Sequence, residues 1–303
     1  LHCAVRDLGV NHIITSPIEH HAIELTAHQL GESGMAKVHW LKLEPDGRPD
    51  LAHLEQLLRE HKDVLVSLMH ANNEVGTRID LHRVGTLCHR YGALFHSDTV
   101  QTMGHYRFDL AATPVDFLSA SAHKFHGPKG VGFLFMRNGA TLKPMILGGS
   151  QERNMRAGTE NIHGIVGMAT ALEVAVRDVE EHHHYIQGLK DLMMKRLGEE
   201  FHGVEFNGDS GPDSLYTVLS VHFTDDGRSE MLIYNLDIEG IACSGGSACS
   251  SGSNKGSHVL MALYPERPGA NVRFSFSRLN TPEEVEEVVG VLKRVFAPAL
   301  SRV

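Results

Sequence analysis

Lys124 lies in the segment of the sequence with the clearest potential for covalent chemistry. The segment, residues 121–130, reads Ser-Ala-His-Lys-Phe-His-Gly-Pro-Lys-Gly and follows a short apolar run. Small residues and glycines around a lysine leave room for a covalently attached ring, and a partly desolvated lysine amine forms a Schiff base near neutral pH. An ordinary surface lysine is equally compatible with this one segment.

Asp98 gives that lysine a possible electrostatic partner. It follows the apolar residues 94–96 and opens the segment Asp98 to Gln101. A pyridinium nitrogen needs a carboxylate to stay protonated and to act as an electron sink. An aspartate after a buried strand also serves as a helix N-cap, so only the combination with Lys124 favours the first interpretation.

Cys249 is the third residue with evident chemistry. It lies in a Gly/Ser-rich stretch, residues 244–257, whose ordinary interpretation is a flexible loop. Sulfur transfer needs a thiolate that attacks a sulfur atom and a persulfide that then reaches an acceptor, which suits an unshielded thiol. Without further support, a free surface cysteine is the alternative. Cys3, Cys88 and Cys243 are interpreted as structural.

Composition limits the partners of the chain. Its 303 residues, 42% of them hydrophobic, are sufficient for a large core and two domains. A net charge of -9 without a long Lys/Arg block predicts no nucleic acid and no membrane surface among the partners. No apolar run approaches the roughly 18 residues that span a bilayer. Four cysteines without a CxxC pair favour a reducing, cytoplasmic location.

The 22 histidines do not form a recognisable metal motif. His182, His183 and His184 are consecutive in a helical stretch, where neighbours point in different directions. The sequence contains neither HExxH nor GxxxxGK[ST]. We therefore predict no metal site.

An alternation of short apolar runs and amphipathic stretches from residue 13 to about 136 predicts βα units around a mainly parallel sheet, an α/β fold. The apolar run at 64–69 is typical of a central strand, and further strands are expected at 94–96, 117–119 and 131–136. Helices are predicted at 51–59 and 81–91, the second ended by Gly92. Ligands of such sheets gather beyond the carboxyl ends of the strands, which brings Asn73, Asp98 and Lys124 to one edge.

The pattern changes after about residue 180. An amphipathic stretch extends to Glu200, an alternating run covers 216–223, and Thr281-Pro282 with Glu284 is the start signal of a terminal helix. We expect a large domain at residues 1–180 and a smaller α+β domain at 181–303 that carries the Cys249 loop.

Together, segments along almost the whole chain resemble those of the class V aminotransferase group of pyridoxal-phosphate enzymes of fold type I, and within it the cysteine desulfurases of the NifS/IscS type. They are, in order, residues 18–22, 69–76, 98–101, 121–130, 148–159 and 246–249. The resemblance implies a large domain with a mainly parallel, seven-stranded type of sheet and a smaller α+β domain.

The resemblance also implies how the cofactor, pyridoxal 5'-phosphate, is held. Lys124 would carry it covalently, Asp98 would pair with the pyridine nitrogen and Gln101 would bond the ring hydroxyl. His20 would stack on the ring, and Asn73 would lie near the ring hydroxyl and the substrate carboxylate. The alternative for His20 is a histidine satisfied at a strand end.

Phosphate and substrate ligands follow from the same resemblance. Ser121 and His123 would hold the phosphate, and Thr159 would reach the phosphate of the neighbouring subunit, which implies a homodimer. Arg273 matches the arginine that clamps the substrate carboxylate. A surface ion pair is the alternative for Arg273, although arginine geometry suits bidentate carboxylate binding.

The implied reaction converts L-cysteine to L-alanine. Lys124 would remove the α-proton, His20 would relay protons, and Cys249 would take the sulfur as a persulfide for a sulfur-acceptor protein in iron-sulfur cluster assembly or thiolation.

One family feature is missing. A Gly-Ala-Thr-Glu type of turn that binds the phosphate precedes the first strand in the family and is absent here, so we expect the chain to be truncated at its N-terminus. A non-catalytic, desulfurase-like fragment that binds a partner is one alternative. A selenocysteine lyase or another β-lyase on the same fold is the other.

Overall fold

The chain forms two compact units. The computed structural model describes residues 1–137, 142–224, 231–245 and 256–296. The first unit comprises residues 1–44, 48–72 and 79–179, and the second comprises 45–47, 73–78 and 180–303. The short segments 45–47 and 73–78 thus belong to the second unit, although the single boundary expected at residue 180 places them with the first.

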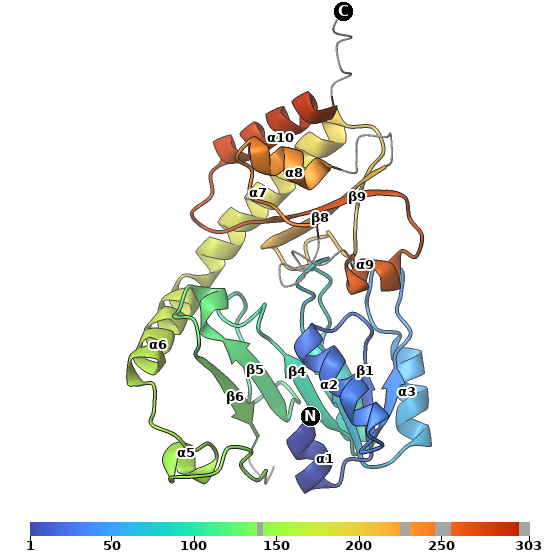
Figure 1. The fold of residues 1–303 in the computed structure, drawn as a ribbon, viewed down its shortest axis with the longest axis vertical. Helices are drawn as coiled ribbons and strands as arrows, with labels where there is room; N and C mark the ends of the chain where they lie inside the picture. Colours follow the sequence, from blue (N-terminus) through green and yellow to red (C-terminus); the bar gives the residue numbers. More distant parts are fainter. Residues whose placement is uncertain (138–141, 225–230, 246–255, 297–303) are drawn as a thin grey trace, which may run out of the picture. The chain divides into compact units, whose positions relative to one another are not determined.

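A six-stranded sheet forms the centre of the first unit (Figure 1). Its first five strands are parallel, and the sixth is antiparallel to the fifth. In spatial order they are β2 (Lys37–Trp40), β1 (His12–Thr15), β3 (Val64–Ser67), β4 (Leu94–Asp98), β5 (Phe117–Ser121) and β6 (Gly132–Met136). The prediction of a mainly parallel sheet with β3 in the middle is confirmed.

Seven helical segments are described in the first unit, and local signals explain where several of them begin and end. They are α1 (His2–Leu8), α2 (His21–Glu32), α3 (Leu51–Glu60), α4 (Leu81–Arg90), the 3-10 helix η1 (Ala122–Phe125), α5 (Gln151–Asn154) and α6 (Ile162–Arg177). Asp50 and Asp80 cap α3 and α4 by accepting backbone N–H bonds. Gly92, with φ 72°, follows α4 as predicted.

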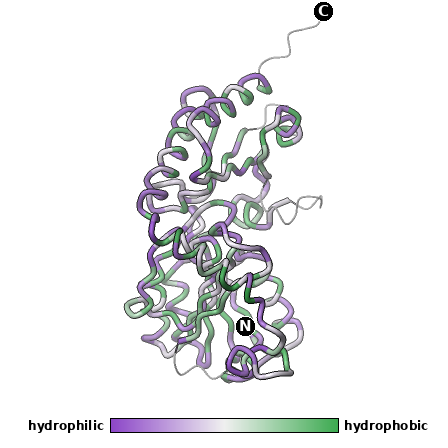
Figure 2. The backbone as a smooth tube through the Cα atoms, turned by 90° about the vertical axis from the view of Figure 1, so that its left-hand side faces the viewer, coloured by the Kyte–Doolittle hydropathy of each residue, from purple (hydrophilic) through white to green (hydrophobic). Residues whose placement is uncertain are grey.

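The central strands of the sheet pack apolar side chains against helices on both faces. Ile13 belongs to a buried cluster with Leu30 of α2, whereas Ile14 belongs to a cluster with Leu54 of α3 and residues of α4. Neighbouring residues of a strand point to opposite faces, so one strand contributes to both clusters. Figure 2 shows the resulting hydrophobic segments inside this unit. Complete burial of one such side chain stabilises the fold by about 2 kcal/mol.

The second unit is built on a three-stranded antiparallel sheet in the order β7 (Val204–Phe206), β8 (Val218–Thr224) and β9 (Gly269–Ser275). Its helices are α7 (Val179–Glu200, beginning at the boundary), α8 (Leu232–Ile238), α9 (His258–Leu263) and α10 (Pro282–Phe296). Thr281 N–H donates to Glu284 Oε2 at 3.0 Å, and Glu284 N–H donates to Thr281 Oγ1 at 3.4 Å. This reciprocal pair confirms the predicted start of the terminal helix.

Two side chains of α7 have structural roles. His183 stacks on the buried ring of Tyr216 with a centroid separation of 4.3 Å. Lys190 is completely buried, donates to Ser214 Oγ at 2.6 Å and to Leu215 O at 3.2 Å, and has its pKa lowered by burial to about 8. Of the helices that the structure describes, none combines the length and apolar character needed to cross a bilayer.

Candidate active site

The carboxyl ends of four parallel strands meet at one edge of the large sheet. Thr15 at the end of β1 pairs with Ser67 at the end of β3, Ser67 pairs with His96 of β4, and Asp98 pairs with Ser119 of β5. Residues that follow these strands therefore emerge at the same edge. The predicted residues His20, Asp98, Gln101, Ser121, His123 and Lys124 all follow or end one of these strands.

Asp98 is the buried anionic group of this edge. Only 9% of its surface is exposed, and its carboxylate Oδ1 accepts a hydrogen bond from Val100 N–H at 2.9 Å. Burial raises the pKa of the Asp98 carboxyl, while that bond and the nearby side chains of His20 and Lys124 lower it. The three residues therefore interact electrostatically, and a buried carboxylate of this kind suits a protonated ring nitrogen.

Lys124 is the third residue of η1, which is held in place by its neighbours. Ala122 and Phe125 are buried, and Phe125 packs in a cluster with residues of α6. Gly127 lies so close to Ala122 that an added Cβ would come within 2.9 Å of its side chain. The Lys124 side chain is exposed, so the described residues do not supply the partial desolvation suggested by the sequence, but they leave space for an attached ring.

His20 is the N-cap of α2. Its Nδ1 accepts a bond from Ala22 N–H at 3.1 Å. Because Nδ1 is the acceptor, the proton of the neutral ring is on Nε2. The helix start therefore fixes the tautomer and leaves Nε2–H as the donor.

Glu19 is a buried acid that the sequence interpretation did not assign. Its carboxyl accepts from Met69 N–H at 2.9 Å and from Ser16 Oγ at 2.8 Å. Burial, with the nearby charge of Asp98, raises its pKa to about 8, although these two hydrogen bonds lower it. Glu19 is therefore protonated at neutral pH, which leaves Asp98 as the charged carboxylate. The available signal was a glutamate between Ile18 and His20 directly after a buried strand.

His96, inside β4, is neutral. Its Nδ1 shares a 2.9 Å hydrogen bond with Ser67 Oγ, and burial lowers its pKa to about 3. The His96 side chain is therefore a buried, uncharged hydrogen-bonding group below the carboxyl ends of the strands.

The residues expected to bind phosphate are only partly assembled. Ser121 Oγ and His123 Nδ1 are 2.8 Å apart, so these two side chains form a pair.

Two further predicted residues lie apart from this pair. Gln101, expected at the ring hydroxyl, is partly buried in the turn after β4. Thr159 lies in an exposed segment between α5 and α6, and none of the described contacts links it to Asp98 or Lys124.

Two residues expected to bind substrate are in contact within the second unit. Arg273, on β9, donates from Nη1 to the Asn73 carbonyl oxygen at 2.8 Å. The bond joins residues that are 200 positions apart in the sequence. The substrate-carboxylate ligands proposed from the sequence are thus neighbours.

Cys249 lies outside the described residues, and the residues that precede and follow that stretch, Ser244 and Ser257, are anchored. Ser244 pairs with Arg273 through backbone bonds, of which Arg273 N–H to Ser244 O is 2.6 Å. Ser257, which caps α9, donates to the buried carboxylate of Glu74. The two flanks are therefore fixed to Arg273 itself and to the residue that follows Asn73.

Cys88 and Cys243 are poor nucleophiles because the pKa of each thiol is raised. Burial and the charge of Asp237 raise the pKa of the Cys243 thiol to about 11, and burial with the charge of Asp116 raises that of Cys88 to about 12. Both remain protonated at neutral pH, and the thiolate is the attacking species.

Comparisons with known proteins agree with this geometry. The family described as "Aminotransferase class-V" matches residues 8–288. The chain is 38% identical to "Cysteine desulfurase IscS" of Dictyoglomus turgidum over 94% of this chain and 72% of that protein. It is 39% identical to "Putative cysteine desulfurase IscS 1" of Bacillus subtilis over 96% and 78%.

Solved structures give the same result. A structure titled "NIFS-LIKE PROTEIN" aligns with a TM-score of 0.84 and 34% identity, covering 97% of this chain and 80% of that one. A NifS-like protein from Rickettsia africae aligns with a TM-score of 0.84 and 26% identity, covering 97% and 79%.

Proposed function

The chain belongs to the aminotransferase class-V family and within it to the cysteine desulfurases, and we propose that it converts L-cysteine to L-alanine with pyridoxal 5'-phosphate and transfers the sulfur through Cys249. The observation that carries the proposal is the buried Asp98 carboxylate at the tip of β4, under the charges of Lys124 and His20. A buried acid beside an exposed amine and a histidine is the set of groups that this cofactor requires.

The residues of the first unit fit the cofactor. When bound, pyridoxal phosphate supplies an electron sink for the negative charge that develops at the substrate α-carbon. Asp98 would hold its ring nitrogen protonated, and Lys124 would be its covalent attachment point. The Ser121–His123 pair would bind the phosphate, with Gln101 at the ring hydroxyl.

Two residues would move protons. Lys124 Nζ, once released from the cofactor, would accept the α-proton of L-cysteine. His20 would donate from Nε2, since Nδ1 is engaged by Ala22 N–H. Protonated Glu19 would keep a second negative charge away from Asp98.

The second unit would bind the substrate and receive its sulfur. Arg273 and Asn73 would orient the carboxylate of L-cysteine. The Cys249 thiolate would attack the substrate sulfur, so that an S–S bond forms while the bond from that sulfur to the substrate β-carbon breaks. The electron pair returns to the substrate β-carbon, where a proton completes the methyl group, and Lys124 Nζ would return a proton to the α-carbon to give alanine. The persulfide would then pass to an acceptor protein.

We also propose a homodimer in which Thr159 reaches the partner subunit. Support comes from apolar side chains that are exposed near it in the sequence. Met145, Ile146, Leu147, Ile162 and Val166 are between 51% and 80% exposed. A second copy would cover such a surface. A reducing compartment such as the cytoplasm would suit the persulfide and the thiols of Cys3, Cys88 and Cys243.

The experiment compares Cys249→Ala with Cys243→Ala in protein loaded with the cofactor. The loaded wild type should absorb near roughly 400 nm. With L-cysteine, Cys249→Ala should still change that absorption but should lose sustained alanine formation and persulfide labelling, because it lacks the attacking thiolate. Cys243→Ala should keep both activities.

Two results would contradict the proposal. Sustained turnover by Cys249→Ala would indicate a β-lyase. A wild-type protein that stays colourless with added cofactor would indicate a binding protein.

A further inference from the structure

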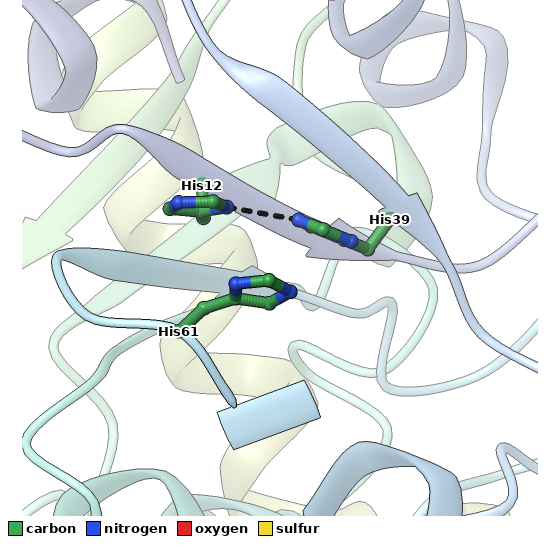
Figure 3. Close-up of side chains that lie close together, drawn as sticks. All are labelled: His12, His39 and His61. Atoms are coloured by element: carbon green, nitrogen blue, oxygen red, sulfur yellow. Dashed lines mark hydrogen bonds between the residues drawn. The ribbon is translucent and has the colours of Figure 1, made fainter. Parts of the chain in front are cut away.

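Three histidines that are distant in the sequence meet in the first unit. The rings of His12, His39 and His61 lie together in Figure 3, and all three are partly buried. One ring nitrogen of each lies within 4.8 Å of the corresponding nitrogens of the other two. This group, called here the histidine cluster, is separate from the residues assigned to the reaction.

The sheet register explains the cluster. His12 pairs with Lys37, and Ile14 pairs with His39, so His12 and His39 share a face with Ile14. That face is covered by α3, which ends at its C-cap, His61. The third histidine is therefore delivered by the helix that packs over the other two.

The backbone around the cluster is firmly connected. The carbonyl oxygen of Asp63 accepts from Asn11 N–H at 2.9 Å and from His12 N–H at 3.3 Å. The His61 N–H donates to Leu57 O at 3.1 Å. These bonds fix the connection between α3 and β3 against the start of β1, so the three rings are carried by rigid elements.

The rings contact one another directly. His12 Nδ1 and His39 Nε2 are 2.9 Å apart, and such a bond needs one nitrogen to be an unprotonated acceptor. His61 stacks on His12 and lies against His39, with centroid separations of 4.3 Å in both cases. Neutral imidazole is the form that binds metal.

We propose that His12, His39 and His61 bind one Zn²⁺ ion, with solvent at the fourth position. Imidazole nitrogens suit borderline transition metals, and three protein ligands with one open position is a common zinc arrangement. Zinc–nitrogen bonds are roughly 2.0 Å long, so tetrahedral ligand atoms lie about 3.3 Å apart. The nitrogens are already within 4.8 Å, and rotations of the rings out of their stack would complete the site.

The surrounding charges favour a cation. Asp63 acts electrostatically on His12, and Glu60 acts on His39, each in the direction that stabilises positive charge. Three neutral ligands leave the ion with its full charge, which these two carboxylates offset. The ion would join β1, β2 and the end of α3, and would therefore act as a structural clamp.

The test measures Zn²⁺ binding by equilibrium dialysis on the cofactor-loaded chain, with zinc sulfate as the only added metal. His39→Asn removes a ligand, and His28→Asn is the matched control, because His28 is an exposed histidine of α2 whose ring lies against Trp40, the neighbour of His39 in the sequence. Wild type and His28→Asn should bind one more equivalent of zinc than His39→Asn. Zinc should also raise the Tm of wild type by about 5 °C at a concentration of 100 times Kd, and this rise should disappear in His39→Asn.

Alanine formation shows whether the variant is folded, since the cluster is not part of the reaction. His61→Asn is the second variant and should behave as His39→Asn does. X-ray absorption on the wild type should give three imidazole nitrogens and one further oxygen or nitrogen around zinc. Unchanged zinc stoichiometry in both active variants, or equal loss in His28→Asn, would overturn the proposal while leaving the proposed reaction intact.

Discussion

At the carboxyl ends of β1, β4 and β5 the reactive side chains end or follow a strand directly, whereas the histidines near the amino end of β1 come from two strands and a helix end. The first group includes a buried carboxylate, Asp98, and the second consists of three imidazole rings that contact one another. Both depend on the same parallel strands. The first group thus combines an acid, an amine and an imidazole, whereas the second offers imidazole nitrogens alone, with the charges of Lys37, Asp63 and Glu60 nearby.

The difference shows what a linear sequence reveals. His20, Asp98 and Lys124 can be recognised because each is a few residues from a predicted strand, and parallel strands end at the same edge. His12 and His39 become neighbours only through the pairing of His12 with Lys37 and of Ile14 with His39. The register of β1 and β2 is not evident from either strand alone, so no sequence pattern indicated that these histidines lie together.

Lys124→Ala should produce the largest effect on activity. It should abolish the reaction and leave zinc binding by the histidine cluster unchanged. Removal of the amine should abolish absorption near roughly 400 nm and lower alanine formation by on the order of 10³-fold or more, since both attachment and proton transfer are lost. Tm should change little because the side chain is exposed. Unchanged zinc binding would support two independent sites, and its loss would break the comparison.

Asp98→Asn should have the next largest effect. The amide keeps an oxygen for Val100 N–H but cannot hold a ring nitrogen protonated, so alanine formation should fall by about 100-fold. Asp50→Asn is the control, because it replaces an equally short acid at the N-cap of α3, where asparagine also caps well. Equal activity of Asp98→Asn and Asp50→Asn would remove Asp98 from the proposed mechanism.

Glu19→Gln should have the smallest effect, on the pH dependence of stability. The folded pKa of Glu19 is about 8 and the unperturbed value is 4.5, so between these values the folded protein retains a proton that the unfolded chain releases. Its contribution to stability is therefore complete below pH 4.5 and falls as pH rises towards 8, by at most about 1.4 kcal/mol per pH unit.

Glutamine mimics the protonated acid and should flatten this decline. Urea unfolding at pH 5, 6, 7 and 8 would measure it, with Glu32→Gln as an exposed control. Identical pH profiles for wild type and Glu19→Gln would show that Glu19 does not hold a proton at the carboxyl edge.

Much of the fold follows from local signals. Helices predicted at 51–59 and 81–91 are observed at 51–60 and 81–90, and the strand predicted at 64–69 is observed at 64–67. Capping residues and apolar periodicity act over a few residues and are visible in the sequence. The antiparallel direction of β6 could also be predicted from the sequence. Residues 122–131 between β5 and β6 are too few for a parallel crossover, which needs about a dozen or more residues.

The remaining features depend on distant contacts. The bond between Arg273 and Asn73 and the bond between Ser257 and Glu74 each connect residues more than 180 positions apart. Burial of Glu19 also requires β3 to lie beside β1. Such contacts form only when the chain has folded, and no local pattern specifies them.

The attachment of Glu19 to Met69 has a consequence for the evolution of the chain. His20 follows Glu19 directly in the sequence. The hydrogen bond from Met69 N–H to Glu19 therefore also fixes where the His20 ring lies relative to the end of β3. One inserted residue between Thr15 and His20 would displace the ring from its neighbours, whereas the exposed turn at 33–35 has no such constraint. Length variation among descendants of this chain should therefore accumulate in the turn and be excluded from the short connection before α2.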